Sequence, residues 1–254
     1  MNYFGKTDLG KSRTENQDAF SAEIFDSDTA LFIVCDGVGG SKGGEVASSI
    51  ACSVFQNSVR NQILPLLSNK KTQIPESTVK FILIHALHDA NEAICEKARS
   101  NESLIEMSTT MVSMLIIKRV AYILNVGDSR AYLCSEDGLT QITKDHSYVQ
   151  DLIDHGKLDP SMASEHSHKN IITRSIGYNT NSTPDLYKVT VERNTFDSFV
   201  LCTDGLTNMV NGSEIQKIIC SFGSLKSKSE KLINLANSHG GYDNITVLLI
   251  SDIR

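Results

Sequence analysis

One stretch, from Leu31 to Ser48, constrains the fold and the chemistry of this chain more than any other. It begins with the apolar run Leu31 to Cys35, which has the length and composition of a buried strand. Asp36 follows, then glycines at 37, 39, 40, 43 and 44, and then a helical pattern from Glu45. Glycine has no Cβ, so backbone carbonyls here can approach a ligand closely. A carboxylate beside such oxygens is typical of a site for Mg²⁺ or Mn²⁺, and a plain strand-turn-helix connection is the alternative.

Two further apolar runs end in aspartate in the same way. YILNVGDSR leads to Asp128 and SFVLCTDGL leads to Asp204, while Asp243 stands just before a last strand-like run. A single aspartate at such a place is usually a turn or cap residue. Four of them, three flanked by glycine, indicate a carboxylate cluster at one edge of the sheets. Because like charges that close do not all ionise without a cation between them, the sequence predicts a polynuclear metal site.

The spacing of apolar residues predicts strands grouped with pairs of helices, which favours layered sheets covered by helices. Pro65 is expected to break the chain after the first helix, and residues 147–170, which are polar and histidine-rich, are expected to form a surface flap. The expected strands are 2–9, 17–25, 29–35, 109–117, 120–126, 131–134, 139–143, 186–191, 199–202 and 245–250; the expected helices are 44–60, 79–94, 148–154, 213–221 and 227–238.

Charge and hydropathy exclude several classes of partner. The net charge of −6 and the pI near 5.6 argue against nucleic acid, whose phosphate backbone requires a basic surface. The longest apolar runs are too short to cross a bilayer, and the N-terminus lacks the apolar core of a signal peptide. We therefore expect a cytoplasmic protein that binds neither nucleic acid nor membrane. The length of 254 residues allows one large domain or two small ones.

The six cysteines contain no C-x-x-C pair, so reduced structural thiols are expected. None is followed six positions later by arginine, the loop with which a thiol-dependent phosphatase holds phosphate.

Seven short motifs stand in one order along the chain: RTENQDAF (13–20), CDGVGG (35–40), GGEVAS (43–48), STT (108–110), GDSR (127–130), CTDGL (202–206) and DNITV (243–247). In type, order and spacing they resemble the metal-dependent serine/threonine protein phosphatase family (PPM, type 2C), over nearly the whole chain. The resemblance implies an α+β fold, a four-layer αββα sandwich of two mostly antiparallel sheets flanked by helix pairs, with a flap near 147–175. It also implies one catalytic domain over residues 1–254, and a monomer.

The resemblance implies two core ions, Mn²⁺ or Mg²⁺, and a third, weaker one. Asp36 would bridge the two core ions, and the Gly37 carbonyl would bind one of them. Asp204 and Asp243 would complete the protein ligands of the other. Asp128 would join Asp204 at the third ion. The simpler alternative for each aspartate is a turn or cap residue.

The same resemblance implies hydrolysis of phosphoserine and phosphothreonine by in-line attack of a metal-bridging water or hydroxide, with no phosphoenzyme. Asp18 would act through bound water, and Arg13 would hold the substrate phosphate with its planar fork of donors. The alternative for Arg13 is a surface ion pair. The expected partners are phosphoproteins, including a serine/threonine kinase and its targets.

One position departs from the family pattern. Many eukaryotic members carry histidine where this chain has Val38, and valine cannot give a proton to the leaving group. The bacterial branch often lacks that histidine. In the flap, His166 is the favoured substrate-facing residue, and a solvated surface histidine is the alternative.

Three rival interpretations remain. Residues 5–12, GKTDLGKS, match the P-loop pattern of nucleotide-binding proteins, but a following helix is not expected there. Residues 26–30 weakly resemble the aspartyl motif of haloacid-dehalogenase-type phosphatases, but fit a hairpin turn. A third interpretation keeps the phosphatase fold as a non-catalytic binding module, and divalent-metal titration with a turnover assay separates it from an enzyme.

Overall fold

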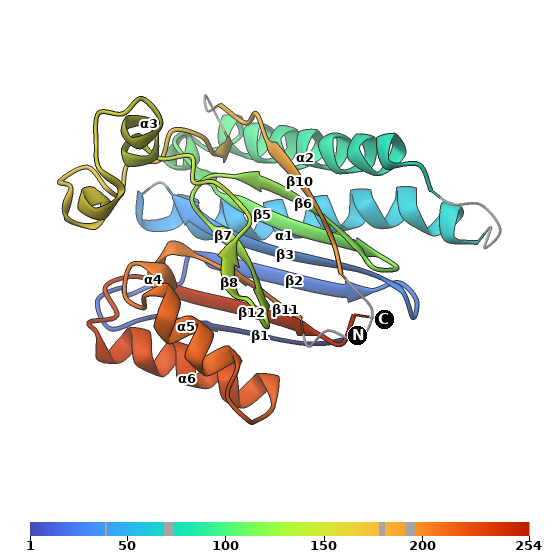
Figure 1. Ribbon diagram of the computed structural model, residues 1–254. Coiled ribbons are helices and arrows are strands. Elements are labelled where there is room, and N and C mark those ends of the chain that lie inside the picture. The colour runs from blue at the N-terminus through green and yellow to red at the C-terminus, as the bar shows by residue number, and fades with distance from the viewer. Residues whose placement is uncertain (39, 69–73, 178–180, 192–196, 254) are drawn as a thin grey trace.

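The computed structural model describes residues 1–38, 40–68, 74–177, 181–191 and 197–253. Its strands form two β-sheets packed face to face, with helices covering each outer side (Figure 1). All the strand pairs in the described ranges are antiparallel. The predicted four-layer αββα sandwich is confirmed.

The first sheet brings the N-terminal strand next to the C-terminal one. Its order is β1 (Asn2–Asp8), β12 (Ile245–Ser251), β11 (Ser198–Cys202), β7 (Arg130–Ser135) and β8 (Gly138–Gln141). The second sheet has the order β10 (Asp185–Thr190), β6 (Val120–Val126), β5 (Met111–Ile117), β3 (Thr29–Val38), β4 (Ser108–Thr109) and β9 (Ile176–Gly177), and β2 (Asp18–Ile24) also pairs with β3.

Long helices cover the second sheet, and shorter ones cover the first. The outer layer on the second sheet is α1 (Gly40–Leu67) and α2 (Glu76–Arg99). The layer on the first sheet is α4 (Asp204–Thr207), α5 (Gly212–Ile219) and α6 (Leu225–Ser238). The segment predicted as a flap contains α3 (Tyr148–Asp154) and a 3₁₀ turn at Pro160–Glu165. No helix within the described ranges is both long and apolar enough to span a membrane.

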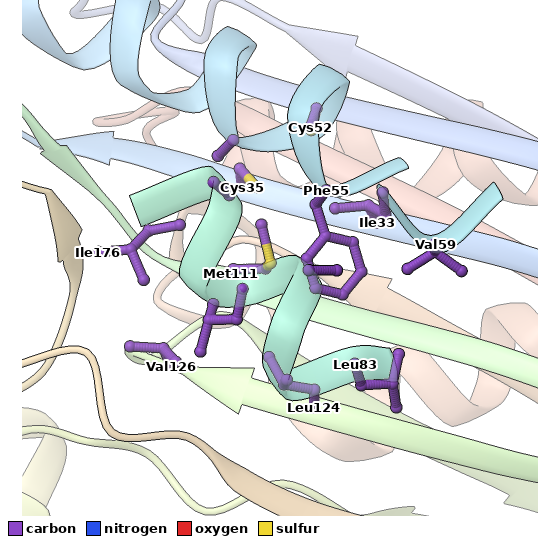
Figure 2. Packing of buried hydrophobic residues seen from close by; sticks show 14 of the residues in the cluster. Ile33, Cys35, Cys52, Phe55, Val59, Leu83, Met111, Leu124, Val126 and Ile176 are labelled. Carbon is purple, nitrogen blue, oxygen red and sulfur yellow. The ribbon is translucent and has the colours of Figure 1, made fainter. Parts of the chain in front are cut away.

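The continuous apolar run of β3 reflects burial on both of its faces. Leu31, Ile33 and Cys35 pack against the α1–α2 layer, whereas Phe32 and Val34 face the other sheet. Successive side chains of a strand point to opposite faces, so a strand between two buried layers must be apolar throughout. Figure 2 shows the helix side of this core, where the ring of Phe55 lies among residues of both helices and of the strands. The core thereby fixes the end of β3 that carries Asp36.

Most elements lie within two or three residues of their predicted bounds, and three predictions were wrong. The first helix starts earlier, at Gly40, and continues through Pro65 to Leu67. Pro65 stands in the last turn, where the missing N–H removes a single bond, and Ser68 N–H still reaches the Leu64 carbonyl at 3.3 Å. The strand expected over 109–117 is interrupted at Thr110, which bonds to Asp36 instead of continuing the ladder.

The P-loop interpretation of residues 5–12 is wrong. Gly5 to Asp8 lie inside β1 and pair with β12, so they cannot wrap a phosphate. The amides of Lys11 and Ser12 donate to the Gly241 carbonyl, and the strand β2 follows rather than a helix. The structure also places residues 26–28 in the β2–β3 hairpin connection, as the sequence indicates.

Candidate active site

A cavity of about 460 Å³ opens where the ends of β2, β3, β11 and β12 meet the turn between β6 and β7. The predicted residues that line it come from five separate parts of the chain: Arg13, Asp36, Gly37, Asp128, Asp204 and Asp243. The structure therefore brings together six of the eight predicted site residues. Asp18 stands beside this set, and His166 does not line the cavity.

Asp36 lies near the end of β3, and hydrogen bonds to its backbone N–H and carbonyl hold it in place. The Asp36 N–H donates to the Thr110 hydroxyl at 3.0 Å. The Asp36 carbonyl accepts from the Thr110 N–H and from the Thr109 hydroxyl, both at 2.8 Å. Two residues of the STT motif, Thr109 and Thr110, therefore fix the backbone of Asp36. Burial raises the pKa of Asp36 well above its ordinary value, and the charges of Asp18 and Asp204 raise it further.

Asp18 stands directly opposite Asp36 in the β2–β3 register, so both side chains lie on one face of the sheet. Its Oδ2 accepts from the hydroxyls of Thr203 at 2.9 Å and Thr246 at 2.7 Å. Its Oδ1 is shielded from solvent and has no hydrogen-bond partner. Burial raises the pKa of Asp18 to about 7, although the two hydroxyls oppose this effect. A buried carboxylate oxygen without a donor is costly unless something binds it.

Asp204 is the first residue of the short helix α4, directly after β11. Its Oδ2 accepts from Asn208 Nδ2 at 2.9 Å, and its Oδ1 is a second buried oxygen without a partner. Burial, followed by the charge of Asp243, raises the pKa of Asp204. The next residue must be glycine, because a Cβ on Gly205 would lie 1.9 Å from the Asn244 carbonyl oxygen. This close approach holds the Asp204 turn against the segment that carries Asp243.

Asp243 is paired with Arg13 in a two-point contact. Arg13 Nη2 donates to Asp243 Oδ2 at 2.9 Å, and Arg13 Nε lies 2.9 Å from Oδ1. The hydrogen bond to Asp243 raises the pKa of Arg13. The Arg13 side chain is 52% exposed, so it extends into the mouth of the cavity rather than into the protein. The Asn244 amide also donates to Asp243 Oδ1, at 2.8 Å.

Asp128 lies in the β6–β7 turn, next to Gly127 with its φ of +108°. Its side chain is buried, and burial together with the charges of Asp204 and Asp145 raises its pKa well above the ordinary value. The turn is anchored by His146, whose Nδ1 accepts from the Gly127 N–H at 3.1 Å. Asp128 is therefore fixed in place facing Asp204.

The donor set suits hard divalent cations. Four of the grouped side chains are carboxylates, two buried carboxylate oxygens lack partners, and burial together with mutual repulsion raises the pKa of Asp36, Asp128 and Asp204. Within the described residues, no group of three or more His, Cys, Asp or Glu side chains is arranged so that it could hold a metal ion. Mg²⁺ commonly keeps several water ligands and uses one or two carboxylates, so a complete protein cage is not required. The site fits Mg²⁺ or Mn²⁺ on these grounds.

His166 lies in the flap, away from the cavity lining. Its ring packs 6.0 Å from that of Tyr148 and 5.6 Å from that of His168, and its Nδ1 accepts from the His168 N–H at 3.1 Å. The flap residues that do line the cavity are Asn170 and Ile172. The structure thus places Asn170 and Ile172, rather than the predicted His166, at the cavity. Val38 is 39% exposed at the cavity wall and has no proton to give.

Several residues of the site were not predicted. Thr203 and Thr246 hold Asp18, and Asn170 and Ile172 line the cavity from the flap. Thr203 directly precedes Asp204 and Thr246 is the fourth residue of the DNITV motif, so hydroxyls near the predicted site aspartates were the available signal. The flap residues carry no such signal.

The fold and the carboxylate-lined cavity define a class of metal-dependent hydrolases, and comparison with known proteins gives the family. The profile described as "Protein phosphatase 2C" matches residues 10–246. The chain therefore belongs to the protein phosphatase 2C family.

Two curated relatives match over nearly their full length. Serine/threonine phosphatase stp of Listeria welshimeri is 35% identical over 247 residues, covering 96% of this chain and 93% of that protein. Protein phosphatase PhpP of Streptococcus pneumoniae is 37% identical over 246 residues, covering 96% and 95%.

Solved structures agree with this assignment. Serine/threonine phosphatase Stp1 from Staphylococcus aureus superposes with a TM-score of 0.86 at 30% identity, covering 98% of this chain and 94% of that one. The catalytic domain of the serine threonine protein phosphatase PstP, in complex with two manganese ions, superposes with a TM-score of 0.80 at 26% identity, covering 100% and 98%.

Proposed function

We propose that this protein hydrolyses phosphoserine and phosphothreonine monoesters in other proteins, including those made by a cognate serine/threonine kinase. The observation that carries the proposal is the cavity in which four aspartates face one exposed guanidinium. Carboxylates hold the cations that phosphoryl transfer requires, and a guanidinium matches phosphate geometry. The names of the relatives, serine/threonine phosphatase and protein phosphatase, support the same activity.

The proposed cofactor is Mn²⁺ or Mg²⁺, with two core ions and a third, weaker one. Asp36, the Gly37 carbonyl, Asp204 and Asp243 are the proposed ligands of the core ions, and Asp128 with Asp204 is the proposed third site. The manganese complex of the related PstP domain supports this choice. Bound divalent ions supply a nucleophile from water near neutral pH and neutralise charge on the phosphoryl oxygens.

The residues around the cations have separate proposed tasks. Thr109 and Thr110 fix Asp36 through its backbone. Asp18 is proposed to act through a bound water that Oδ1, the oxygen without a partner, accepts from, while its Oδ2 is held by two hydroxyls. A group whose position is already fixed loses little entropy when the substrate reacts, so this order favours catalysis.

Arg13 is proposed to bind the substrate phosphate. In this structure its guanidinium is engaged with Asp243 at 2.9 Å, so phosphate binding requires an exchange of partners. The exchange is favourable once the charge of Asp243 is compensated from the cavity side. The side chain's exposure at the cavity mouth leaves room for this movement.

The experiment that tests the proposal measures phosphate release from phosphopeptides by wild type and by the variants Asp36→Asn and Lys11→Ala. Wild type with Mn²⁺ should release phosphate from phosphoserine and phosphothreonine peptides, Asp36→Asn should lose nearly all turnover, and Lys11→Ala should match wild type. Lys11 is exposed in the residues 5–12 segment, so it is a matched control. Tight peptide binding without phosphate release by wild type would favour the non-catalytic module.

A further inference from the structure

Two cysteines 86 positions apart in sequence meet between β7 and the end of α5. The Sγ atoms of Cys134 and Cys220 lie 3.6 Å apart, within thiol hydrogen-bonding distance. Cys134 is buried on β7, whereas Cys220 is the C-cap of α5 and is exposed. Both are thiols in this structure, and neither lines the active-site cavity. The phosphatase chemistry therefore leaves this pair without a role.

The pair opens onto a cleft of about 1070 Å³ between β7, β11 and the α5–α6 connection. Cys134, Cys220 and Lys228 line this cleft, and a small reagent reaches the exposed Cys220 sulfur from solvent, whereas Cys134 is 3% exposed. Burial and the neighbouring Cys220 raise the pKa of Cys134 to about 12, and the positive charge of Lys228 opposes this effect. The exposed Cys220 is consequently the sulfur that reacts first.

We propose that Cys134 and Cys220 form an oxidation site, at which a hydroperoxide converts the two thiols to a reversible disulfide that ties α5 to β7. In the first step the Cys220 thiolate attacks one peroxide oxygen: an S–O bond forms, the O–O bond breaks, the other oxygen leaves as water or an alcohol after taking a proton from solvent, and Cys220 becomes a sulfenic acid. In the second step the Cys134 sulfur attacks Cys220, the S–S bond forms and the S–O bond breaks. The hydroxide leaves with the Cys134 proton as water, so each hydroperoxide molecule oxidises one dithiol.

The local structure allows the closure. A disulfide requires about 2.05 Å between the sulfurs, so they must approach by about 1.5 Å. Cys134 is fixed by pairing of β7 with both β8 and β11. Cys220 stands at a helix end, followed by a fully exposed Phe222 and by Gly223 at a φ of +137°. The movement therefore falls on the α5 end, which, unlike Cys134, is not held between two paired strands.

A second cysteine pair provides an internal control. Cys35 and Cys52 lie beside each other in the α1–β3 core (Figure 2), and they are 0% and 6% exposed. Unlike the Cys134–Cys220 pair, this pair has no exposed member, and neither cysteine lines one of the three described cavities, so no sulfur of the pair is open to a reagent in solvent. Proximity without access should leave this pair reduced while Cys134 and Cys220 react.

The consequence is greater stability with little change in turnover. The bond would close a chain segment of about a third of the protein, and linking distant residues lowers the entropy of the unfolded chain. We expect the melting temperature to rise by roughly 5–10 °C on oxidation. Cys134 lies about 13 Å along β7 from Arg130, where the strand leaves the turn that holds Asp128, so the active site should be largely unaffected.

The test treats the folded protein with hydrogen peroxide, blocks the remaining thiols under denaturing conditions, and maps the peptides by mass spectrometry. Wild type should lose two of its six thiols and the mass of two hydrogens, yield a Cys134–Cys220 linked peptide, and recover on reduction. Cys220→Ser should keep its thiols and show no rise in melting temperature. Cys134→Ser should stop at a Cys220 sulfenic acid that dimedone traps.

Cys95→Ser is the matched control, because Cys95 lies on α2 on the opposite side of the molecule and should leave the Cys134–Cys220 link intact. If Cys134→Ser does not fold, Cys134→Ala and the exposed Cys220→Ser variant carry the test. The proposal is overturned if wild type accumulates a Cys220 sulfinic acid with Cys134 still a thiol, or if Cys35–Cys52 is the link that forms. These readouts do not use phosphatase activity, so their failure is distinct from a failure of the proposed function.

Discussion

Replacing Asp18 by asparagine should stabilise the metal-depleted protein at neutral pH and above. The pKa of Asp18 is raised by burial from an ordinary 3.8 to about 7, which corresponds to about 4 kcal/mol of unfavourable free energy when the group is charged. Asparagine removes that charge and keeps an oxygen to accept from Thr203 and Thr246. Its amide group then occupies the place of Oδ1 without an acceptor, which costs about 1–3 kcal/mol. The net gain should be about 1–3 kcal/mol.

The stability difference between Asp18→Asn and wild type depends on pH. A carboxyl whose folded pKa is raised keeps its proton in the folded state between 3.8 and about 7, where the unfolded chain has released it. Wild type therefore loses stability as the pH rises through this window, and Asp18→Asn lacks this contribution. The difference between the two proteins should grow in favour of the variant by about 2–3 kcal/mol between about pH 5 and pH 8.

Urea unfolding in the presence of a chelator measures this difference at several pH values. The matched control is Asp28→Asn, because Asp28 is exposed on the hairpin that joins β2 to β3. Its curve should stay parallel to that of wild type. A pH-independent difference between Asp18→Asn and wild type, or a variant that is the less stable one at about pH 8, would refute the reasoning.

Three further variants test other parts of the site. Arg13→Ala should raise KM for a phosphopeptide by about 10- to 100-fold in steady-state kinetics, because it removes the charged hydrogen bonds from the guanidinium to the substrate phosphate. An unchanged KM would contradict the proposed role of Arg13 in phosphate binding. Asp128→Ala should slow turnover and raise the metal concentration required, and loss of both core ions in calorimetry would show the assignment to be wrong. His166→Ala should change kcat by less than about tenfold on phosphopeptide and nitrophenyl phosphate alike, since His166 does not line the cavity; a selective loss of about 10²–10⁴-fold on phosphopeptide would establish it as the proton donor.

The carboxylate cluster could be predicted because its signal is local. Asp36 and Asp204 each end an apolar run of strand length, and the two-faced burial of β3 explains why that run is unbroken. The α1–α2 layer was recognisable from apolar residues at three and four spacings, and the bounds of α3 were predicted correctly. In these segments, periodicity and the tertiary structure favour the same element.

The remaining features depend on contacts between distant segments. Thr203 and Thr246 are 185 and 228 positions from Asp18. They meet it only because β12, which pairs with β11 in the first sheet, packs against β2 of the second sheet. The placement of Asn170 rather than His166 at the cavity is decided by how the flap packs, with His166 drawn to Tyr148. Pro65 was expected to stop a helix, yet packing of α1 against α2 carries the helix past it.

The most direct test of the proposed mechanism is the dependence of turnover on divalent metal. Exhaustive chelation followed by gel filtration should abolish phosphate release from a phosphothreonine peptide, and titration with Mn²⁺ should restore it. Restoration should follow the occupancy of the metal sites measured by calorimetry, and Asp204→Asn should fail to recover, because it loses a charge that the proposed core and third sites share. Full activity of wild type after complete metal removal would contradict the account.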